Sequence, residues 1–267
     1  MQGRLLPKYK KRYQAHPVDY WQDEFLISRE LDLDCIEFIV DYNEVEKNPL
    51  IKNGGLDEVK FIIEKTGVKV KTICADYFME APLHSENSEV VVSSKKMMLQ
   101  LLSSASKLGV TEIVIPCVDQ SSLSGQDAEN RFLNNVLPLL EVAEEKNINF
   151  SLETDLDPKA FLNLLKRFNS KRIKVNYDIG NSAALGYNPI EELDAYGDKI
   201  SDIHIKDRIL KGGPVFLGQG NADFPVFFSK LKEFNYQGPF IMQAYRDNEG
   251  VEIFKKQLAW IKQYLSE

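Results

Sequence analysis

The sequence predicts an α/β protein, a single (β/α)8 TIM barrel that occupies residues 1–267. Eight short apolar runs with strand character alternate with longer segments whose apolar residues recur at helical spacing, and this alternation is typical of a parallel sheet covered by helices. Several of the runs end in a polar residue, as barrel strands do where they present a site. A chain of 267 residues suits one barrel, and the sequence contains no Pro/Gly/Ser-rich linker that would divide it.

The predicted strands follow one another at intervals that leave room for one helix between neighbours. They span residues 1–5, 34–40, 69–75, 111–117, 148–153, 173–178, 201–206 and 238–243. The first is the weakest prediction, because Met1 leaves it fewer residues than a barrel strand usually has. Either this strand is short, or the natural chain begins further upstream.

Helices are predicted wherever apolar residues recur every three or four positions, because such residues share one helical face. One segment carries Phe132, Val136, Leu139, Leu140 and Ala143, a second carries Phe161, Leu164, Leu165 and Phe168, and a third carries Phe254, Leu258, Ile261 and Leu265. The third segment lies at the end of the chain and would close the ring of helices.

The composition bounds the classes of function. Hydrophobic residues make up 43% of the chain and charged residues 27%, which supplies ample material for a large core. The formal net charge of -7 argues against nonspecific binding to nucleic acid, although residues 6–14 form a local basic patch. Cys35, Cys74 and Cys117 are odd in number and widely spaced, so we expect reduced thiols and a cytoplasmic protein. No run of about 18 apolar residues predicts a membrane span.

Four polar residues stand at the downstream ends of predicted strands and are the candidate metal ligands: Glu153, Asp178, His204 and Gln243. The carboxyl ends of barrel strands meet at one face, so these side chains should converge. Taken singly, Glu153 could form a salt bridge, Asp178 could belong to a turn and His204 could be a core residue. Together they form a mixed oxygen and nitrogen set that favours a catalytic divalent metal.

Several motifs resemble the xylose isomerase-like barrel superfamily, in its sugar phosphate isomerase/epimerase branch. They are SLETD, VNYDIGN and DIHIKDR, the stretch with Gly218, Gly220, Asp223 and Phe224, MQGRL at the start and IEFIVD at 36–41. The resemblance covers essentially the whole chain. It implies one divalent ion, manganese in the first place with cobalt, magnesium or zinc as alternatives, and a small sugar or sugar phosphate as substrate. It also leaves a homo-oligomer open.

Two residues depart from the pattern of the family. In relatives that resemble ketose 3-epimerases, the carboxylate at the position of Gln243 is both a ligand and the second acid/base. An amide has no proton to exchange near neutral pH, although its carbonyl oxygen can still bind a metal. Asn181 stands where many relatives carry a histidine. Both departures argue against epimerisation by two bases.

The remaining hypothesis has one base. A metal would chelate the substrate carbonyl and the neighbouring hydroxyl, and Glu153 would act as general base to form an enediolate. Return of the proton to the adjacent carbon would give isomerisation, with epimerisation or dehydration as sister reactions. The alternative is a barrel that binds a sugar without turnover, having lost the second carboxylate at Gln243.

Further candidates are expected to contact the substrate: Arg4, Glu37, Asp76, Asn181, Lys206, Arg208 and Gln219. Lys206 and Arg208 could hold an anionic or oxygen-rich group, or could form surface ion pairs with Asp207 or Asp202. The glycines of the loop at 210–224, which contains Gln219, could let backbone N–H groups approach an anion, or could make the loop a flexible lid.

One of these candidates has an alternative of its own. Glu37 could pair with Arg4 in the barrel interior instead of contacting a polyol.

The endonuclease IV branch of the superfamily holds three zinc ions with several histidines. This chain has only His16, His84 and His204 and is acidic, so we do not expect that activity.

Overall fold

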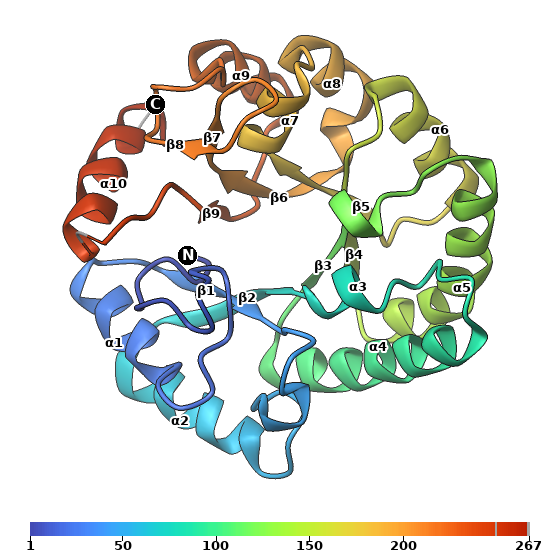
Figure 1. The fold of residues 1–267 in the computed structure, drawn as a ribbon, viewed down its shortest axis with the longest axis horizontal. Coiled ribbons are helices and arrows are strands. Elements are labelled where there is room, and N and C mark those ends of the chain that lie inside the picture. Colours follow the sequence, from blue (N-terminus) through green and yellow to red (C-terminus); the bar gives the residue numbers. More distant parts are fainter. Residues whose placement is uncertain (249, 266–267) are drawn as a thin grey trace.

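Seven parallel strands surrounded by helices form a nearly closed barrel in the computed structural model, which describes residues 1–248 and 250–265 (Figure 1). The strands are β1 (Cys35–Ile39), β2 (Lys69–Cys74), β3 (Glu112–Cys117), β4 (Asn149–Thr154), β5 (Ile173–Asp178), β6 (Ile200–Ile205) and β9 (Phe240–Met242). Neighbouring strands pair in parallel, and their order around the barrel follows their order along the chain. The predicted TIM barrel is confirmed.

The first predicted strand, residues 1–5, was wrong, because these residues form no regular strand. Its first two residues nevertheless bridge the gap between β9 and β1, because the backbone N–H of Glu37 donates to Met1 at 2.8 Å and that of Gln2 donates to Met242 at 3.3 Å. Gly3 then turns the chain away with a φ of +56°, a backbone conformation that favours glycine. The segment is therefore too short to form a ladder.

Helices cover the outside of the barrel, and most follow a strand in the chain (Figure 1). They are α1 (Gln22–Glu30), α2 (Gly55–Thr66), α3 (Tyr77–Glu80), α4 (Ser88–Leu108), α5 (Gln126–Glu145), α6 (Pro158–Phe168), α7 (Ile179–Leu185), α8 (Pro189–Tyr196), α9 (Phe224–Leu231) and α10 (Val251–Leu265). Side-chain caps begin several of them. Asp157 accepts from two backbone N–H groups at the start of α6, for example, and Asn188 caps α8.

The predicted apolar faces of the helices match the core. All the apolar positions singled out in α5 and α6 are buried. In α10, Phe254 and Ile261 are buried, whereas Leu265 is 40% exposed because it lies at the last turn of the helix. The three cysteines are free, as expected. Within residues 1–248 and 250–265, none of the helices combines the length and hydropathy that crossing a bilayer requires.

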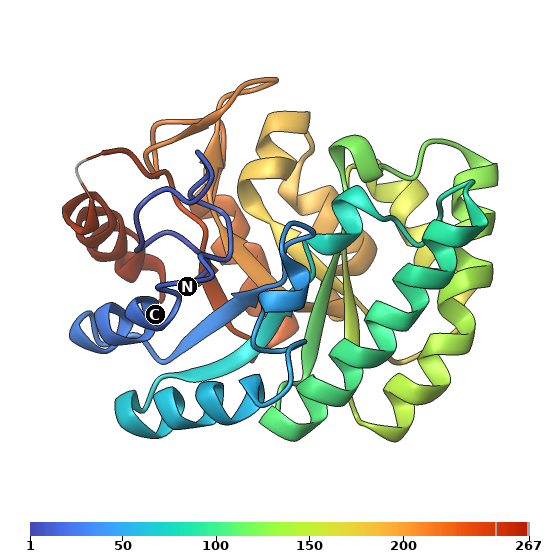
Figure 2. The ribbon, with the colours of Figure 1, turned by 60° about the horizontal axis from the view of Figure 1, so that its bottom comes forward.

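A small antiparallel hairpin begins just before the loop at 210–224 and ends within it. Its strands are β7 (Asp207–Arg208) and β8 (Pro214–Val215), and it rises beyond the ends of the barrel strands in the side view (Figure 2). Hydrogen bonds from three backbone N–H groups hold the following turn to the carboxylate of Asp207, which is buried. This loop is therefore an ordered structure that stands beside the mouth of the barrel.

Candidate functional site

Three potential metal ligands meet at the C-terminal ends of adjacent strands. Glu153 is the penultimate residue of β4, Asp178 the last of β5, and His204 the penultimate of β6. One ligand atom of each lies within 4.8 Å of the others, and all three residues are buried. The parallel register explains this convergence, because Asp178 pairs directly with His204 across β5 and β6. We call these three residues the site cluster.

Gln243 lies beside the site cluster but its amide has other partners. Its Oε1 accepts a hydrogen bond from Lys206 Nζ at 2.7 Å, and its Nε2 donates to Gln2 Oε1 at 2.6 Å. Because an ammonium group only donates, Lys206 orients the amide with its oxygen toward Nζ. Gln243 Nε2 consequently faces His204 Nδ1, at 3.4 Å.

Asp178 carries a negative charge in this site. Burial would raise the pKa of its carboxyl group, but Lys206 and His204 outweigh burial and hold that pKa well below its usual range. Lys206 Nζ lies 3.2 Å and His204 Nδ1 3.8 Å from Asp178 Oδ2. The backbone N–H of Asn181 adds a hydrogen bond of 2.8 Å to Oδ1.

Glu153 behaves differently, although it is buried beside Asp178. Burial first, and then the charge of Asp178, raise the pKa of Glu153 to about 7. Its Oε1 accepts from Asn181 Nδ2 at 2.6 Å, and Arg208 Nη1 donates to Asn181 Oδ1 at 2.9 Å. Arg208 therefore orients the Asn181 amide so that its NH2 group points to Glu153. A carboxyl group with a pKa near neutrality is suited to accept and return protons.

His204 is completely buried between carboxylates. Its Nε2 lies 2.8 Å from Glu37 Oε1, and burial alone would lower the pKa of the imidazole. Glu37 and Asp178 more than reverse this effect and raise the pKa of His204 well above its usual range. A metal that binds the ring must therefore displace a proton.

A cavity of about 380 Å³ opens above the site cluster. Its volume falls within the range of roughly 300–1,000 Å³ that is typical of small-molecule sites. Among the residues predicted from the sequence, those that line it are Arg4, Asp76, Glu153, Asn181, Lys206, Arg208 and Gln243. A larger cavity of about 780 Å³ lies at the other end of the barrel, where Glu112, Ser201 and Tyr236 line it. We assign the site to the smaller cavity, because Glu153 and Gln243, two of the four predicted ligands, line it.

Two residues that were predicted to contact the substrate, Glu37 and Gln219, are not among the residues that line this cavity. Glu37 is fully buried on β1 beneath His204, where its second oxygen accepts from Thr72 Oγ1 at 2.7 Å. Gln219 is exposed on the glycine-rich loop. The backbone N–H groups of Gly218 and Gly220 already bind the carboxylate of Asp207, and a side chain at Gly220 would collide with that carboxylate.

Lys206 and Arg208 do not form the surface ion pairs that were the alternative to substrate binding. Lys206 bridges Asp178 and Gln243. Arg208 donates through Nε and Nη2 to the backbone oxygen of Gly212, in the hairpin loop, and through Nη1 to Asn181. Both side chains line the cavity and could also meet a ligand.

Three residues that line the cavity, Arg12, Gln14 and Asp41, were not predicted from the sequence, and the first two belong to the loop that follows the first segment. Gln14 lies between Arg4 and Asp76, accepting from Arg4 Nη2 at 3.2 Å and donating to Asp76 Oδ2 at 3.3 Å. Arg12 forms a salt bridge of 2.8 Å with Asp41. Asp41 directly follows the predicted strand at 34–40. It could have been found by the strand-end rule, by which polar residues at the downstream ends of barrel strands are candidate site residues. Arg12 and Gln14 carry no comparable signal, because only the folded loop brings them to the mouth.

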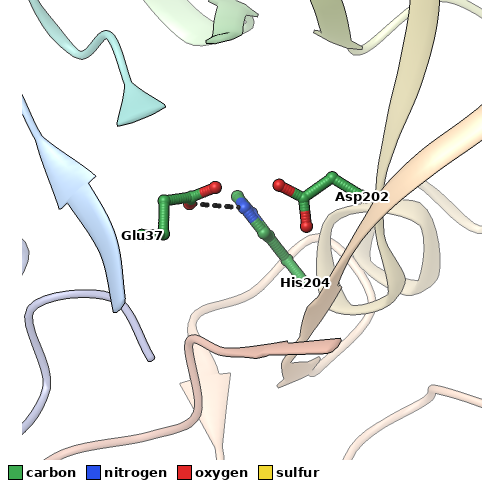
Figure 3. A group of neighbouring side chains, drawn as sticks. All are labelled: Glu37, Asp202 and His204. Atoms are coloured by element: carbon green, nitrogen blue, oxygen red, sulfur yellow. Dashed lines mark hydrogen bonds and ion pairs between the residues drawn. The ribbon is translucent and has the colours of Figure 1, made fainter. Parts of the chain in front are cut away.

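The site cluster fits a divalent metal ion. It offers two carboxylates and an imidazole from three rigid strands, a mixed donor set that suits manganese, zinc or related ions. The second group of potential ligands found in the described residues also contains His204, together with Glu37 and Asp202 (Figure 3). His16 and His84 belong to neither group and pack against aromatic rings instead.

Comparisons with known proteins agree with this architecture. The model of the family described as "Xylose isomerase-like TIM barrel" matches residues 25–264. The L-ribulose-5-phosphate 3-epimerase UlaE of Escherichia coli O1:K1 / APEC is 25% identical over 256 residues, which cover 91% of this chain and 89% of that protein.

Two solved structures share the fold. The structure of D-psicose 3-epimerase in the presence of D-fructose has a TM-score of 0.73 at 16% identity and covers 92% of this chain and 94% of its own. The structure of the IOLI protein with a zinc atom has a TM-score of 0.72 at 19% identity, with the same two coverages of 92% and 94%. At these identities the likeness concerns the fold alone.

Proposed function

Because this chain belongs to the xylose isomerase-like TIM barrel family, we propose that it is a divalent-metal-dependent isomerase or epimerase of a small sugar or sugar phosphate. The observation that carries the proposal is the site cluster, in which ligand atoms from three strands lie within 4.8 Å of one another beside a sugar-sized cavity. The relative named L-ribulose-5-phosphate 3-epimerase supports the class of substrate.

We assign the metal to Glu153, Asp178 and His204, with Gln243 as a neighbour that could lend its carbonyl oxygen after a rotation away from Lys206. Manganese is the first candidate, and cobalt, magnesium and zinc are the alternatives. Zinc is present in the related IOLI structure, and magnesium in that of a xylose isomerase-like protein from Mycobacterium smegmatis. Such an ion would stabilise the negative charge that develops on the substrate oxygens.

Glu153 is the proposed general base. It would remove the proton from the carbon next to the substrate carbonyl and produce an enediolate. Its place in the lining of the cavity and its hydrogen bond to Asn181, which orients the carboxyl group, support this role. Asp76 and Arg4, which line the same cavity, would contact substrate hydroxyl groups, and Lys206 and Arg208 would face its more oxygen-rich end.

The amide of Gln243 determines which of the possible reactions we favour. With an amide at this position, Glu153 alone would move the proton, so transfer between adjacent carbons on one face, which is isomerisation, is favoured over epimerisation by two bases. Loss of hydroxide from the same enediolate would give dehydration. A protein that binds sugar without turnover is the second candidate, because the Gln243 oxygen is bound to Lys206.

The decisive experiment measures metal content and proton exchange together. The purified protein would be reconstituted with manganese, cobalt, magnesium or zinc, and ketoses and ketose phosphates would be incubated with it in D2O. We expect about one ion per chain, lost in His204→Ala, and deuterium incorporation next to the carbonyl of at least one sugar. Metal binding without exchange would support the non-catalytic alternative, and absence of both would refute the proposal.

A further inference from the structure

A buried carboxylate lies on the side of His204 that faces away from the cavity. Figure 3 shows Glu37 and Asp202 on either side of the imidazole ring, in the interior of the barrel. All three residues are fully buried. The proposed mechanism uses only the Nδ1 atom of this ring, which faces Asp178. It leaves the function of Glu37 unexplained.

Both oxygens of Glu37 have defined partners. Oε1 lies 2.8 Å from His204 Nε2, and Oε2 accepts from Thr72 Oγ1 at 2.7 Å. β1 and β2 hold this arrangement, since Glu37 pairs with Thr72 in the parallel register. A carboxylate can only accept at the first of these contacts, so the ring nitrogen that faces it must carry the proton.

The opposite ring nitrogen has a different environment. His204 Nδ1 lies 3.8 Å from Asp178 Oδ2, on the side of the site cluster. The NH2 group of Gln243 approaches the same nitrogen at 3.4 Å, and Lys206 orients that amide. The NH2 group of Asn176 lies 3.2 Å from Nδ1 and 3.1 Å from Nε2, so it does not distinguish the two nitrogens. An amide NH2 group is a donor, so it favours a lone pair on Nδ1 once the proton that a metal displaces has left this nitrogen.

We propose that Glu37 is a positioning residue that holds the proton of His204 on Nε2, so that the lone pair of Nδ1 faces Glu153 and Asp178 as a metal ligand. This inference rests on the metal site of the proposed function. Metal-binding histidines commonly donate their other ring N–H to a carboxylate, which fixes the tautomer and the ring orientation. Glu37 thereby acts on the metal through His204 without touching the substrate cavity.

Asp202 offers a competing explanation. Glu37, Asp202 and His204 could together hold an ion of their own, because their ligand atoms also lie within 4.8 Å of one another. The contact of 2.8 Å between Glu37 and His204 Nε2 favours a hydrogen bond over two ligands separated by an ion. The two explanations predict different numbers of bound ions and different coordinating nitrogens.

The test uses the zinc-loaded full-length chain labelled with ¹⁵N. The chain has three histidines, so His204→Ala identifies the ring signals of His204 in a long-range ¹H–¹⁵N correlation spectrum. We expect zinc on Nδ1 and a proton on Nε2. Zinc on Nε2 would overturn the inference and leave the proposed function intact, whereas a wild-type chain that binds no zinc would overturn both.

Variants of Glu37 separate positioning from a general structural role. Glu37→Met removes the acceptor at similar length and should weaken zinc binding by about 10- to 100-fold, as loss of such a partner typically does. Glu37→Gln keeps a carbonyl oxygen for Nε2–H and should recover most of the affinity. Equal losses in both variants would contradict the inference.

Thr72→Val is the matched control. It removes the hydrogen bond to the other oxygen of Glu37 and leaves the contact with His204, so zinc affinity should fall by less than in Glu37→Met. Elemental analysis of Asp202→Asn completes the test. A wild-type content of two ions that drops to one in this variant would show that Glu37 and Asp202 are ligands, which would overturn the positioning role.

Discussion

Carboxylates are buried at both ends of the barrel interior, but the groups that surround them differ between the two ends. At the N-terminal ends of the strands, a group that we call the floor cluster consists of Glu112, Asn149, Ser151 and Ser201. Both oxygens of Glu112 accept hydrogen bonds there, from one amide and two hydroxyl groups, at 2.7 to 2.9 Å. At the C-terminal ends, the site cluster places two carboxylates against one imidazole.

This difference separates structural polar groups from a functional site. Burial raises the pKa of Glu112, and its hydrogen bonds come from neutral donors, with the charge of Lys174 as a weaker influence, so this end of the barrel buries a carboxyl group by hydrogen bonding. In the site cluster, Asp178 is kept charged while its neighbour Glu153 has a pKa of about 7. Titratable groups whose environments drive their pKa values apart are typical of acid/base sites.

The largest expected effect is on proton exchange. Glu153→Gln should lower the rate of deuterium incorporation by about 10²- to 10⁴-fold, because the amide cannot accept the proton. Glu112→Gln, at the other end of the barrel, is the matched control and should change that rate by less than a factor of about two, since it leaves every cavity residue in place. An equal loss of deuterium incorporation in the two variants would show that the site cluster has no special role in proton exchange.

Another buried carboxylate extends the comparison to stability. Glu24 on α1 lies outside both clusters, and burial raises its pKa to about 7 from 4.5 in the unfolded chain. Because the folded chain holds this proton more tightly, Glu24 favours folding at low pH and loses that contribution as the pH rises from 4.5 to 7.

Glu24→Gln removes this titration. The variant should gain about 2 to 3 kcal/mol relative to wild type between pH 4.5 and pH 8. Urea unfolding at both pH values would measure the change in unfolding free energy. A pH dependence that is the same in both proteins would show that Glu24 does not titrate differently on folding.

Much of this organisation follows from local sequence patterns. The predicted strand at 173–178 coincides with β5, and the apolar spacing of α6 matches its buried face. The strand-end rule also singled out Glu153, Asp178 and His204, because periodicity and the parallel fold together determine where such residues lie.

The remaining features depend on contacts between distant parts of the chain. The bond between Gln243 and Gln2 joins residues that are 241 positions apart. Closure of the barrel by two residues at the start of the chain likewise involves β9, near its end. Glu37 interrupts an apolar run, which marks it as unusual, but its partner His204 lies 167 positions away. Local patterns carry no information on such pairings.

Gln243→Glu would increase the difference between the two ends of the barrel, because it would place a third carboxylate beside the two of the site cluster. A carboxylate still accepts from Lys206, and Gln2 could rotate its amide, whose Nε2 is buried without a hydrogen-bond partner, to donate to it. We expect the affinity for manganese to rise by roughly tenfold, which corresponds to about 1.4 kcal/mol. Competition with a fluorescent chelator would measure it, and an unchanged affinity would place residue 243 outside the coordination shell.

The smallest expected effect tests the floor cluster itself. Ser151 Oγ donates to Glu112 and also contacts Ser201 Oγ, at 2.9 Å. Ser151→Ala should lower the unfolding free energy by about 1 kcal/mol, because Glu112 keeps its donors from Asn149 and Ser201. Metal affinity and proton exchange should stay at wild-type values. A loss of metal in this variant would mean that the two ends of the barrel are coupled, and the floor cluster would then have to be counted as part of the site.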